Sequence, residues 1–157
     1  MDKITKCLLK KDTTCKPVWF MRQAGRYLPE FRKIRKSNPN FINLCLNSEL
    51  SSEITLQPIK RFDLDAAIIF SDILIVPFAL GQNINFDKKK GPMLSKLDIE
   101  GFKKLKENKF LTMLNPVYNT LEQTRKKLDK SKALIGFVGA PWTLAVYMLG
   151  LKNDNIL

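Results

Sequence analysis

The sequence lacks histidine altogether, and its three cysteines, Cys7, Cys15 and Cys45, share no C-x-x-C spacing. The first absence excludes, within these 157 residues, a histidine-ligated metal site and any mechanism in which imidazole acts as the base. The cysteine pattern favours neither a zinc site nor a disulfide framework. Glycine-rich phosphate loops, nucleophile elbows and EF-hand loops are also lacking, so the common motifs for nucleotides, acyl transfer and calcium do not apply.

Signals for targeting or membrane insertion are weak. The first six residues lead into no long apolar run, so we expect no signal peptide, and free thiols fit a reducing, cytoplasmic location. Residues 133–151 are uncharged, mostly apolar and about long enough to cross a bilayer. Gly139, Pro141 and Gly150 interrupt this segment, which favours a short strand, a turn and a helix over a membrane span.

Basic residues are abundant and unevenly distributed. Lysine and arginine total 27 against 15 acidic residues, a formal charge of +12, yet four of the six arginines (Arg22, Arg26, Arg32 and Arg35) fall within fourteen residues. A guanidinium fork grips carboxylate or phosphate groups in a bidentate way, so the cluster predicts an anion site; the simpler alternative is a solvated basic face. Lysine clusters such as Lys88–Lys90 are interpreted as solvated surface, and without a motif we expect no nucleic-acid partner.

Apolar runs without alternation predict buried strands, and the segments between them predict helices. The expected strands span 17–21, 65–70 and 133–138, and the expected helices span 30–36, 49–61, 98–109, 116–128 and 143–149. Ser48 is expected to cap the second helix, Pro58 to kink or shorten it, and Asn115 to cap the helix that begins at Pro116. Continuous apolar strands that alternate with helices predict an α/β fold with parallel strands.

Polar or flexible residues follow each predicted strand. The loop that begins at Arg22 follows the first strand, Asp72 follows the second, and Gly139-Ala140-Pro141 follows the third. Because the carboxyl ends of parallel strands meet at one edge of a sheet, we expect these groups to form a single site.

Two side chains near these ends have alternative interpretations. Asp72 stands among apolar residues, where a carboxylate is costly to bury without a partner. It is either a helix cap or salt-bridge partner, or an acceptor that binds N–H donors and stabilises a developing cation. By periodicity alone Tyr147 is interpreted as a core aromatic residue. Asp63 and Asp65 are interpreted as turn residues.

Three longer motifs, in order along the chain, carry a resemblance to a known family. They are Pro17-Val18-Trp19-Phe20-Met21-Arg22-Gln23-Ala24-Gly25-Arg26-Tyr27-Leu28-Pro29-Glu30, then Leu56-Gln57-Pro58-Ile59 with Asp65-Ala66-Ala67-Ile68-Ile69-Phe70-Ser71-Asp72-Ile73-Leu74, and Gly136-Phe137-Val138-Gly139-Ala140-Pro141-Trp142-Thr143. They resemble the signatures of uroporphyrinogen decarboxylases. The resemblance implies a (β/α)₈ (TIM) barrel that, without a metal or organic cofactor, removes the four acetate carboxylates of uroporphyrinogen III to give coproporphyrinogen III in heme biosynthesis.

The resemblance also implies roles for individual residues. Asp72 would bind the pyrrole N–H groups and stabilise the transition state, and Arg22, also a candidate proton donor, would bind substrate carboxylates. The other implied substrate-binding residues are Gln23, Ala24, Gly25, Arg26 and Tyr147. Arg32 and Arg35 are secondary candidates.

The chain departs from the family in length. The family is about twice as long, and its second half supplies a serine or threonine and a histidine to the site, so residues 1–157 are expected to form only the N-terminal half of a barrel. A half-barrel exposes strand edges and apolar faces, which predicts aggregation or association, for example with a C-terminal half. The resemblance also implies a homodimer. Two alternatives stay open: an inactive remnant that binds porphyrinogens, and a basic nucleic-acid-binding protein.

Overall fold

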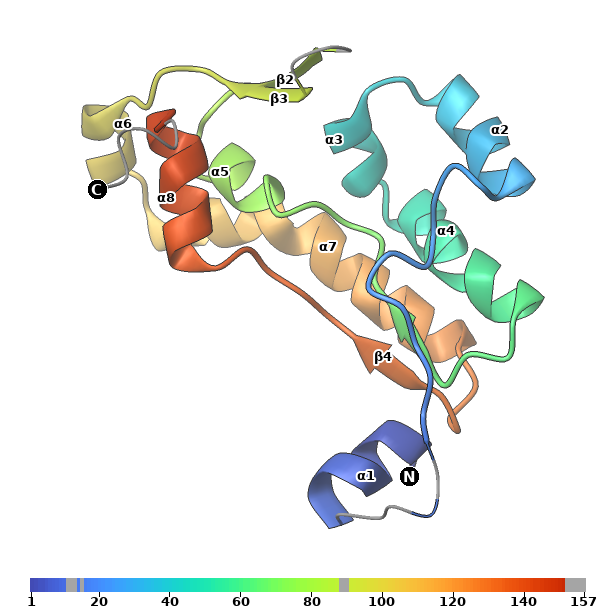
Figure 1. Ribbon diagram of the computed structural model, residues 1–157. Helices are drawn as coiled ribbons and strands as arrows, with labels where there is room; N and C mark the ends of the chain where they lie inside the picture. Colours follow the sequence, from blue (N-terminus) through green and yellow to red (C-terminus); the bar gives the residue numbers. More distant parts are fainter. Residues whose placement is uncertain (11–13, 15, 88–90, 152–157) are drawn as a thin grey trace. The chain divides into compact units, whose positions relative to one another are not determined.

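The computed structural model of the protein describes residues 1–10, 14, 16–87 and 91–151 (Figure 1). Cys15 and the lysine cluster at 88–90, both singled out in the sequence, lie outside the described residues. The chain divides into two compact units. Unit 1 comprises Met1–Ser71 and Pro116–Phe137, and unit 2 comprises Asp72–Asn115 and the residues from Val138 onward.

Short helices and strands make up both units. The elements of unit 1 are α1 (Lys3–Lys10), α2 (Pro29–Ser37), α3 (Phe41–Cys45), α4 (Ser48–Arg61), β1 (Ala66–Ile68), β4 (Ala133–Ile135) and the second half of α7 (Glu107–Lys127). Those of unit 2 are α5 (Ile75–Ala79), β2 (Ile84–Asp87), β3 (Gly91–Leu94), α6 (Ile99–Lys103), α8 (Pro141–Leu149) and the first half of α7.

The centre of unit 1 is a parallel pair of strands covered by helices. β1 pairs with β4 in a register that places Ala66 opposite Ala133 and Ile68 opposite Ile135. Leu56 of α4, Ala67 of β1 and Leu128 pack together in one buried cluster. The α/β class and the parallel pairing are therefore confirmed, although both strands are shorter than the sequence predicts.

The predicted strand over residues 17–21 is absent, and a side chain explains why. Val18 N–H donates to Oδ2 of Asp65 at 2.8 Å, and Asp65 N–H donates to Val18 O at 2.9 Å. Two residues further on, Phe20 N–H donates to Oε1 of Gln23 at 2.9 Å, and Nε2 of Gln23 donates to Ala66 O at 3.1 Å. The carboxamide of Gln23 thus stands between the segment and β1, where direct backbone bonds would otherwise extend the sheet.

Helix caps differ from the predicted ones. Asn47, not Ser48, caps α4, since Oδ1 of Asn47 accepts from Leu50 N–H at 3.0 Å. The hydroxyl of Ser48 instead donates to Pro116 O at 3.1 Å and joins α4 to α7. Pro58 does not end α4, which continues to Arg61.

The helical region between 98 and 128 is divided differently from the prediction. α6, capped by Asp98, ends at Lys103, and α7 begins at Glu107 and runs through Pro116 instead of starting there. Burial of Thr120 and Thr124, together with Leu114, gives α7 a continuous packed face, which outweighs the backbone hydrogen bond that proline removes.

Two further observations concern a strand pair that the sequence does not predict and the apolar segment weighed as a membrane span. β2 and β3 form an antiparallel pair with Ile84 opposite Leu94, in a stretch for which the sequence predicts no strand. Residues 133–151 form β4, a connecting segment and α8, not one helix. Among the described residues, no helix combines the length and the apolar character needed to cross a membrane.

Candidate active site

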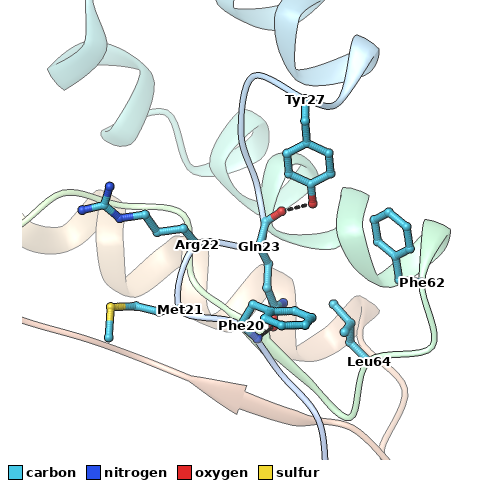
Figure 2. A pocket seen from close by; sticks show the side chains of 7 residues that line it. All are labelled: Phe20, Met21, Arg22, Gln23, Tyr27, Phe62 and Leu64. Atoms are coloured by element: carbon cyan, nitrogen blue, oxygen red, sulfur yellow. Dashed lines mark hydrogen bonds between the residues drawn. The ribbon is translucent and has the colours of Figure 1, made fainter.

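The loop that contains Arg22 and Arg26 is held by its own neighbours. The buried amide of Gln23 joins it to the backbone of Phe20 and Ala66, as described above. The hydroxyl of Tyr27 donates back to Gln23 O, a bond visible in Figure 2. Gln23 was predicted as a substrate-binding residue; in the structure its carboxamide bonds within the protein and fixes the course of the loop.

A turn places Arg26 at the end of this loop. Leu28 N–H donates to Gly25 O at 3.0 Å, and the side chain of Leu28 is completely buried. Nη1 of Arg32, in the first turns of α2, donates to Arg26 O at 2.8 Å and to Tyr27 O at 3.3 Å. The successive carbonyls of Arg26 and Tyr27, just before α2, therefore both accept hydrogen bonds from Arg32.

The guanidinium groups of Arg22 and Arg26 are exposed and make no hydrogen bond or ion pair with any residue that the structure describes. Arg35 differs, since it donates to Asn38 O and lies over the ring of Phe41, 5.3 Å from the ring centroid. Of the four clustered arginines, Arg22 and Arg26 thus present unused N–H donors to an anionic ligand, in a chain with a formal charge of +12.

A cavity of about 660 Å³ opens beside this loop in unit 1. Five of its seven lining residues have apolar or aromatic side chains, and the other two are Arg22 and Gln23; the five are Phe20, Met21, Tyr27, Phe62 and Leu64. Figure 2 shows the rings of Phe20, Tyr27 and Phe62 on one side of the loop, while Arg22 extends to the other side in this view. The cavity therefore combines an apolar wall with a cationic edge, the composition expected of a site for a large organic anion.

The carboxyl end of β1 is anchored by a buried hydroxyl. Oγ1 of Thr55 donates to Ser51 O at 2.7 Å and accepts from Phe70 N–H at 2.8 Å. The ring of Phe70 packs edge-on against Phe31 and Phe41, with centroid distances of 5.7 and 5.9 Å. These contacts fix the backbone two residues before Asp72.

Asp72 begins the turn that leads into α5 of unit 2. Its Oδ1 accepts from Leu74 N–H at 2.8 Å, and its backbone carbonyl accepts from Ile75 N–H at 3.2 Å. The carboxylate has no ion pair among the described residues. Burial raises the pKa of Asp72 above its ordinary value, and the bond from Leu74 N–H only partly opposes this. Such a carboxylate can accept further N–H donors.

Close packing after β4 involves Gly139. A Cβ at this position would lie 2.6 Å from Cδ2 of Leu144 and 3.1 Å from Cβ of Ile73, so a larger residue next to Asp72 would force these neighbours to shift. Gly25, by contrast, has only ordinary contacts around its missing Cβ.

Tyr147 lies on α8, which packs against α5 within unit 2. Its side chain is 39% exposed, and its hydroxyl has no hydrogen-bond partner among the described residues. It is therefore not the fully buried core aromatic that periodicity alone predicts.

The structure thus groups the predicted site residues within each unit. Arg22, Gln23, Ala24, Gly25 and Arg26 share one loop in unit 1, and Asp72 and Tyr147 belong to unit 2. No cluster of potential metal ligands occurs in the described parts of the chain. The sequence does not reveal the roles of Thr55 and Asp65. Only the fold shows that the Thr55 hydroxyl bonds the chain just after β1 and that the Asp65 carboxylate, just before β1, bonds the neighbouring segment.

Comparisons with known proteins identify the family. The sequence model of the uroporphyrinogen decarboxylase (URO-D) family matches residues 1–156. The chain is 51% identical over 147 residues to uroporphyrinogen decarboxylase from Agrobacterium fabrum, covering 94% of this chain and 43% of that protein. The same enzyme from Campylobacter jejuni is 49% identical, with 92% of this chain and 44% of that protein covered. The chain therefore spans about two fifths of the length of these relatives.

A solved structure supports the fold. A methyltransferase from Methanosarcina mazei superposes with a TM-score of 0.70, covering 93% of this chain and 44% of that chain at 18% identity. This likeness concerns the fold alone, whereas the sequence similarity extends through the arginine loop, Asp72 and the Gly139 turn. On the match over nearly its whole length, the chain belongs to the uroporphyrinogen decarboxylase family.

Proposed function

We propose that this chain takes part in the cofactor-free decarboxylation of uroporphyrinogen III to coproporphyrinogen III. The observation that carries the proposal is that a family member holds two kinds of unsatisfied group: in unit 1, guanidinium groups without internal partners on a fixed loop, and in unit 2, a desolvated carboxylate at Asp72. The substrate supplies the complement of each, eight peripheral carboxylates and four convergent pyrrole N–H groups.

The proposed chemistry assigns binding to the loop and charge stabilisation to Asp72. Arg22 and Arg26 bind substrate carboxylates, and Tyr147 supplies a hydroxyl to the substrate. Protonation of a pyrrole carbon makes the ring cationic, and the bond to the departing carbon dioxide then breaks as its electrons neutralise the ring. A second proton then adds to the side-chain carbon, and the ring carbon releases the proton that it first gained, so that each carboxylate is replaced by one hydrogen and the pyrrole is restored. Asp72 accepts the pyrrole N–H groups and stabilises the cation, and Arg22 is the proposed proton donor.

Gln23, Ala24 and Gly25 contribute to binding as parts of the loop. Because the amide of Gln23 already bonds Phe20 and Ala66, we assign Gln23 a role through the backbone position that it fixes. Ala24 and Gly25 are small, so the substrate can approach the backbone closely between the two arginines.

We further propose that residues 1–157 contribute the N-terminal half of a (β/α)₈ barrel in the cytoplasm, completed by the remaining length that the relatives possess. A barrel needs eight strands, whereas β1 and β4 pair only with each other in the described residues. The segment beside β1 supports this proposal, since Phe20 and Met21 are 61% and 74% exposed. Association with the complementary half, or a homodimer, would cover such side chains.

The proposal is tested by an anaerobic assay with uroporphyrinogen III, in which products are separated by carboxylate number. The chain is assayed alone and together with a co-expressed C-terminal half from a relative. Products with seven to four carboxylates support the proposal in either setting. Arg26→Ala should weaken substrate binding, whereas Lys127→Ala, which removes an equal charge from an exposed position, should not. A soluble, assembled pair that forms no product overturns the proposed activity.

Binding without turnover would favour the second candidate, an inactive porphyrinogen-binding protein. The exposed loop arginines and the desolvated Asp72 serve binding equally well, so only product formation separates the two functions. Neither binding nor turnover in the assembled pair would reject both.

A further inference from the structure

We propose that Arg32 is a positioning residue that holds Arg26 in the orientation needed to bind a substrate carboxylate. This inference rests on the proposed function of the Arg22–Arg26 loop. It assigns to Arg32 a contribution through the backbone of Arg26, in place of direct contact with the substrate.

The geometry of Arg32 supports an action on the turn. Its Nη1 lies between two carbonyls, 2.8 Å from Arg26 O and 3.3 Å from Tyr27 O. Its backbone N–H donates to Leu28 O at 3.1 Å, and Leu28 N–H closes the turn to Gly25 O. Arg32 therefore donates to the carbonyls of three successive residues, Arg26, Tyr27 and Leu28. These bonds fix the backbone of the turn, and the side chain of Arg26 stays free.

A fixed backbone matters for an exposed, long side chain. A free arginine loses rotamer freedom when it binds a carboxylate, and a mobile turn would add backbone entropy to that loss. Since Arg32 restrains the turn before the ligand arrives, only the side-chain freedom of Arg26 is lost on binding. We therefore expect Arg32 to improve affinity, with no part in the bond-breaking step.

Lys36 provides a matched comparison on the same helix. It is exposed on α2, carries the same charge and makes no hydrogen bond or ion pair with any residue that the structure describes. Removing Lys36 takes away the same charge without releasing the turn. A general effect of positive charge would therefore affect both variants alike.

The test is a double-mutant cycle in the chain as assembled for activity, with anaerobic uroporphyrinogen III as the probe. Arg32→Met should raise KM about two- to tenfold with little change in kcat, the size expected for one hydrogen-bonded restraint. In an Arg26→Ala background the same substitution should have no further effect, because Arg32 acts through Arg26. Lys36→Met should leave KM unchanged.

Amide hydrogen exchange supplies a readout that does not depend on activity. Arg32→Met should speed exchange at the Leu28 amide, and Lys36→Met should not. Additive effects of Arg32→Met and Arg26→Ala on KM would overturn the proposal and make Arg32 a separate ligand. Unchanged exchange at Leu28 would also overturn it. If the wild-type assembly neither binds nor converts uroporphyrinogen III, the proposed function fails, and the exchange result alone decides whether Arg32 fixes the turn.

Discussion

Two aspartates flank β1, and each accepts one backbone N–H, but they differ in charged partners and in the direction of their pKa shift. Asp65, immediately before the strand, accepts from Val18 N–H at 2.8 Å and pairs with Nζ of Lys3 at 2.7 Å. Its pKa is lowered, first by Lys3 and then by Val18. Asp72, four residues after the strand, has one backbone donor and no ion pair among the described residues, and burial raises its pKa.

The difference separates a structural carboxylate from a candidate functional one. The bonds of Asp65 tie α1 and the segment that contains Val18 to the edge of β1, so its charge stabilises the fold. The charge of Asp72 is costly to the fold and can be offset by a ligand that brings its own N–H donors. Unfavourable groups of this kind concentrate at functional sites, where stability is exchanged for binding.

The largest expected effect comes from neutralising Asp72. Asp72→Asn keeps an oxygen for Leu74 N–H but removes the charge that would stabilise the cationic ring. We expect the decarboxylation rate to fall by about 10²–10³, the usual loss when one electrostatic stabiliser is removed. The rate of product formation under anaerobic conditions measures this change, and Asp63→Asn, at an exposed position, serves as the control.

The same substitution should not destabilise the protein. Because the pKa of Asp72 is raised in the folded state, folding favours the protonated form, and the ionised form opposes folding as pH rises above the ordinary value of about 3.9. Asp72→Asn should therefore raise the free energy of unfolding at neutral pH, with the gain vanishing in acid. Urea unfolding at pH 7 and pH 3 checks both signs. A loss of stability at pH 7 would make Asp72 a structural residue like Asp65.

Removing the carboxylate of Asp65 should have the opposite effect on stability. Asp65→Ala leaves Val18 N–H without its acceptor and removes the ion pair with Lys3, which together cost about 1 kcal/mol in the free energy of unfolding because Val18 is partly exposed to water. Asp65→Asn can still accept that bond but cannot pair with Lys3, so its loss should be smaller. Denaturant unfolding of both variants separates the hydrogen bond from the ion pair, and equal losses would contradict this assignment.

The pH dependence gives a further check on Asp65. Its lowered pKa means that the charge stabilises the fold above the ordinary value of about 3.9 and that this contribution is lost as pH falls through the lower, folded-state value. The difference between the wild type and Asp65→Asn should therefore shrink between pH 5 and pH 2. A constant difference across this range would show that the charge of Asp65 does not contribute to the difference in stability.

The contrast between the two aspartates also marks how far sequence reasoning reaches. Asp72 could be singled out because an apolar run ends in a carboxylate, and the α/β class follows from the same runs. Asp65 was interpreted only as a turn residue, since nothing local shows that Lys3 and Val18, at least 47 positions away, meet it in the fold. Long-range pairing of this kind is invisible to local patterns.

Residues 17–21 illustrate a second limit. The run Val18-Trp19-Phe20 has the composition of a buried strand, yet Gln23 inserts its carboxamide between this segment and β1. Similarly, Pro116 after Asn115 is a strong local signal for a helix start, but α7 passes through it because its packed face continues. In both places a tertiary contact overrides a local preference.

Packing beside Asp72 should tolerate little change. Gly139→Ala forces a Cβ against Leu144 and Ile73, and we expect a loss of about 1–3 kcal/mol in the free energy of unfolding, as for other overpacked sites. Gly25→Ala meets only ordinary contacts and is the matched control from the arginine loop. Thermal unfolding of both variants checks this contrast. Equal Tm values would mean that the segment before α8 shifts freely.

The smallest effect is expected at Thr55, which anchors the chain between the two aspartates. Thr55→Val keeps the shape but leaves Phe70 N–H without its acceptor, so we expect a loss of about 1 kcal/mol. Thr112→Val removes a similar hydroxyl, bonded to Asn108 O on an exposed turn of α7, and should change stability by less than about 0.5 kcal/mol. Urea unfolding compares the two. Thr55→Val could also weaken substrate binding while Thr112→Val does not. In that case the anchored end of β1 helps to place Asp72. The contrast between the two aspartates then depends on backbone position as well as on charge.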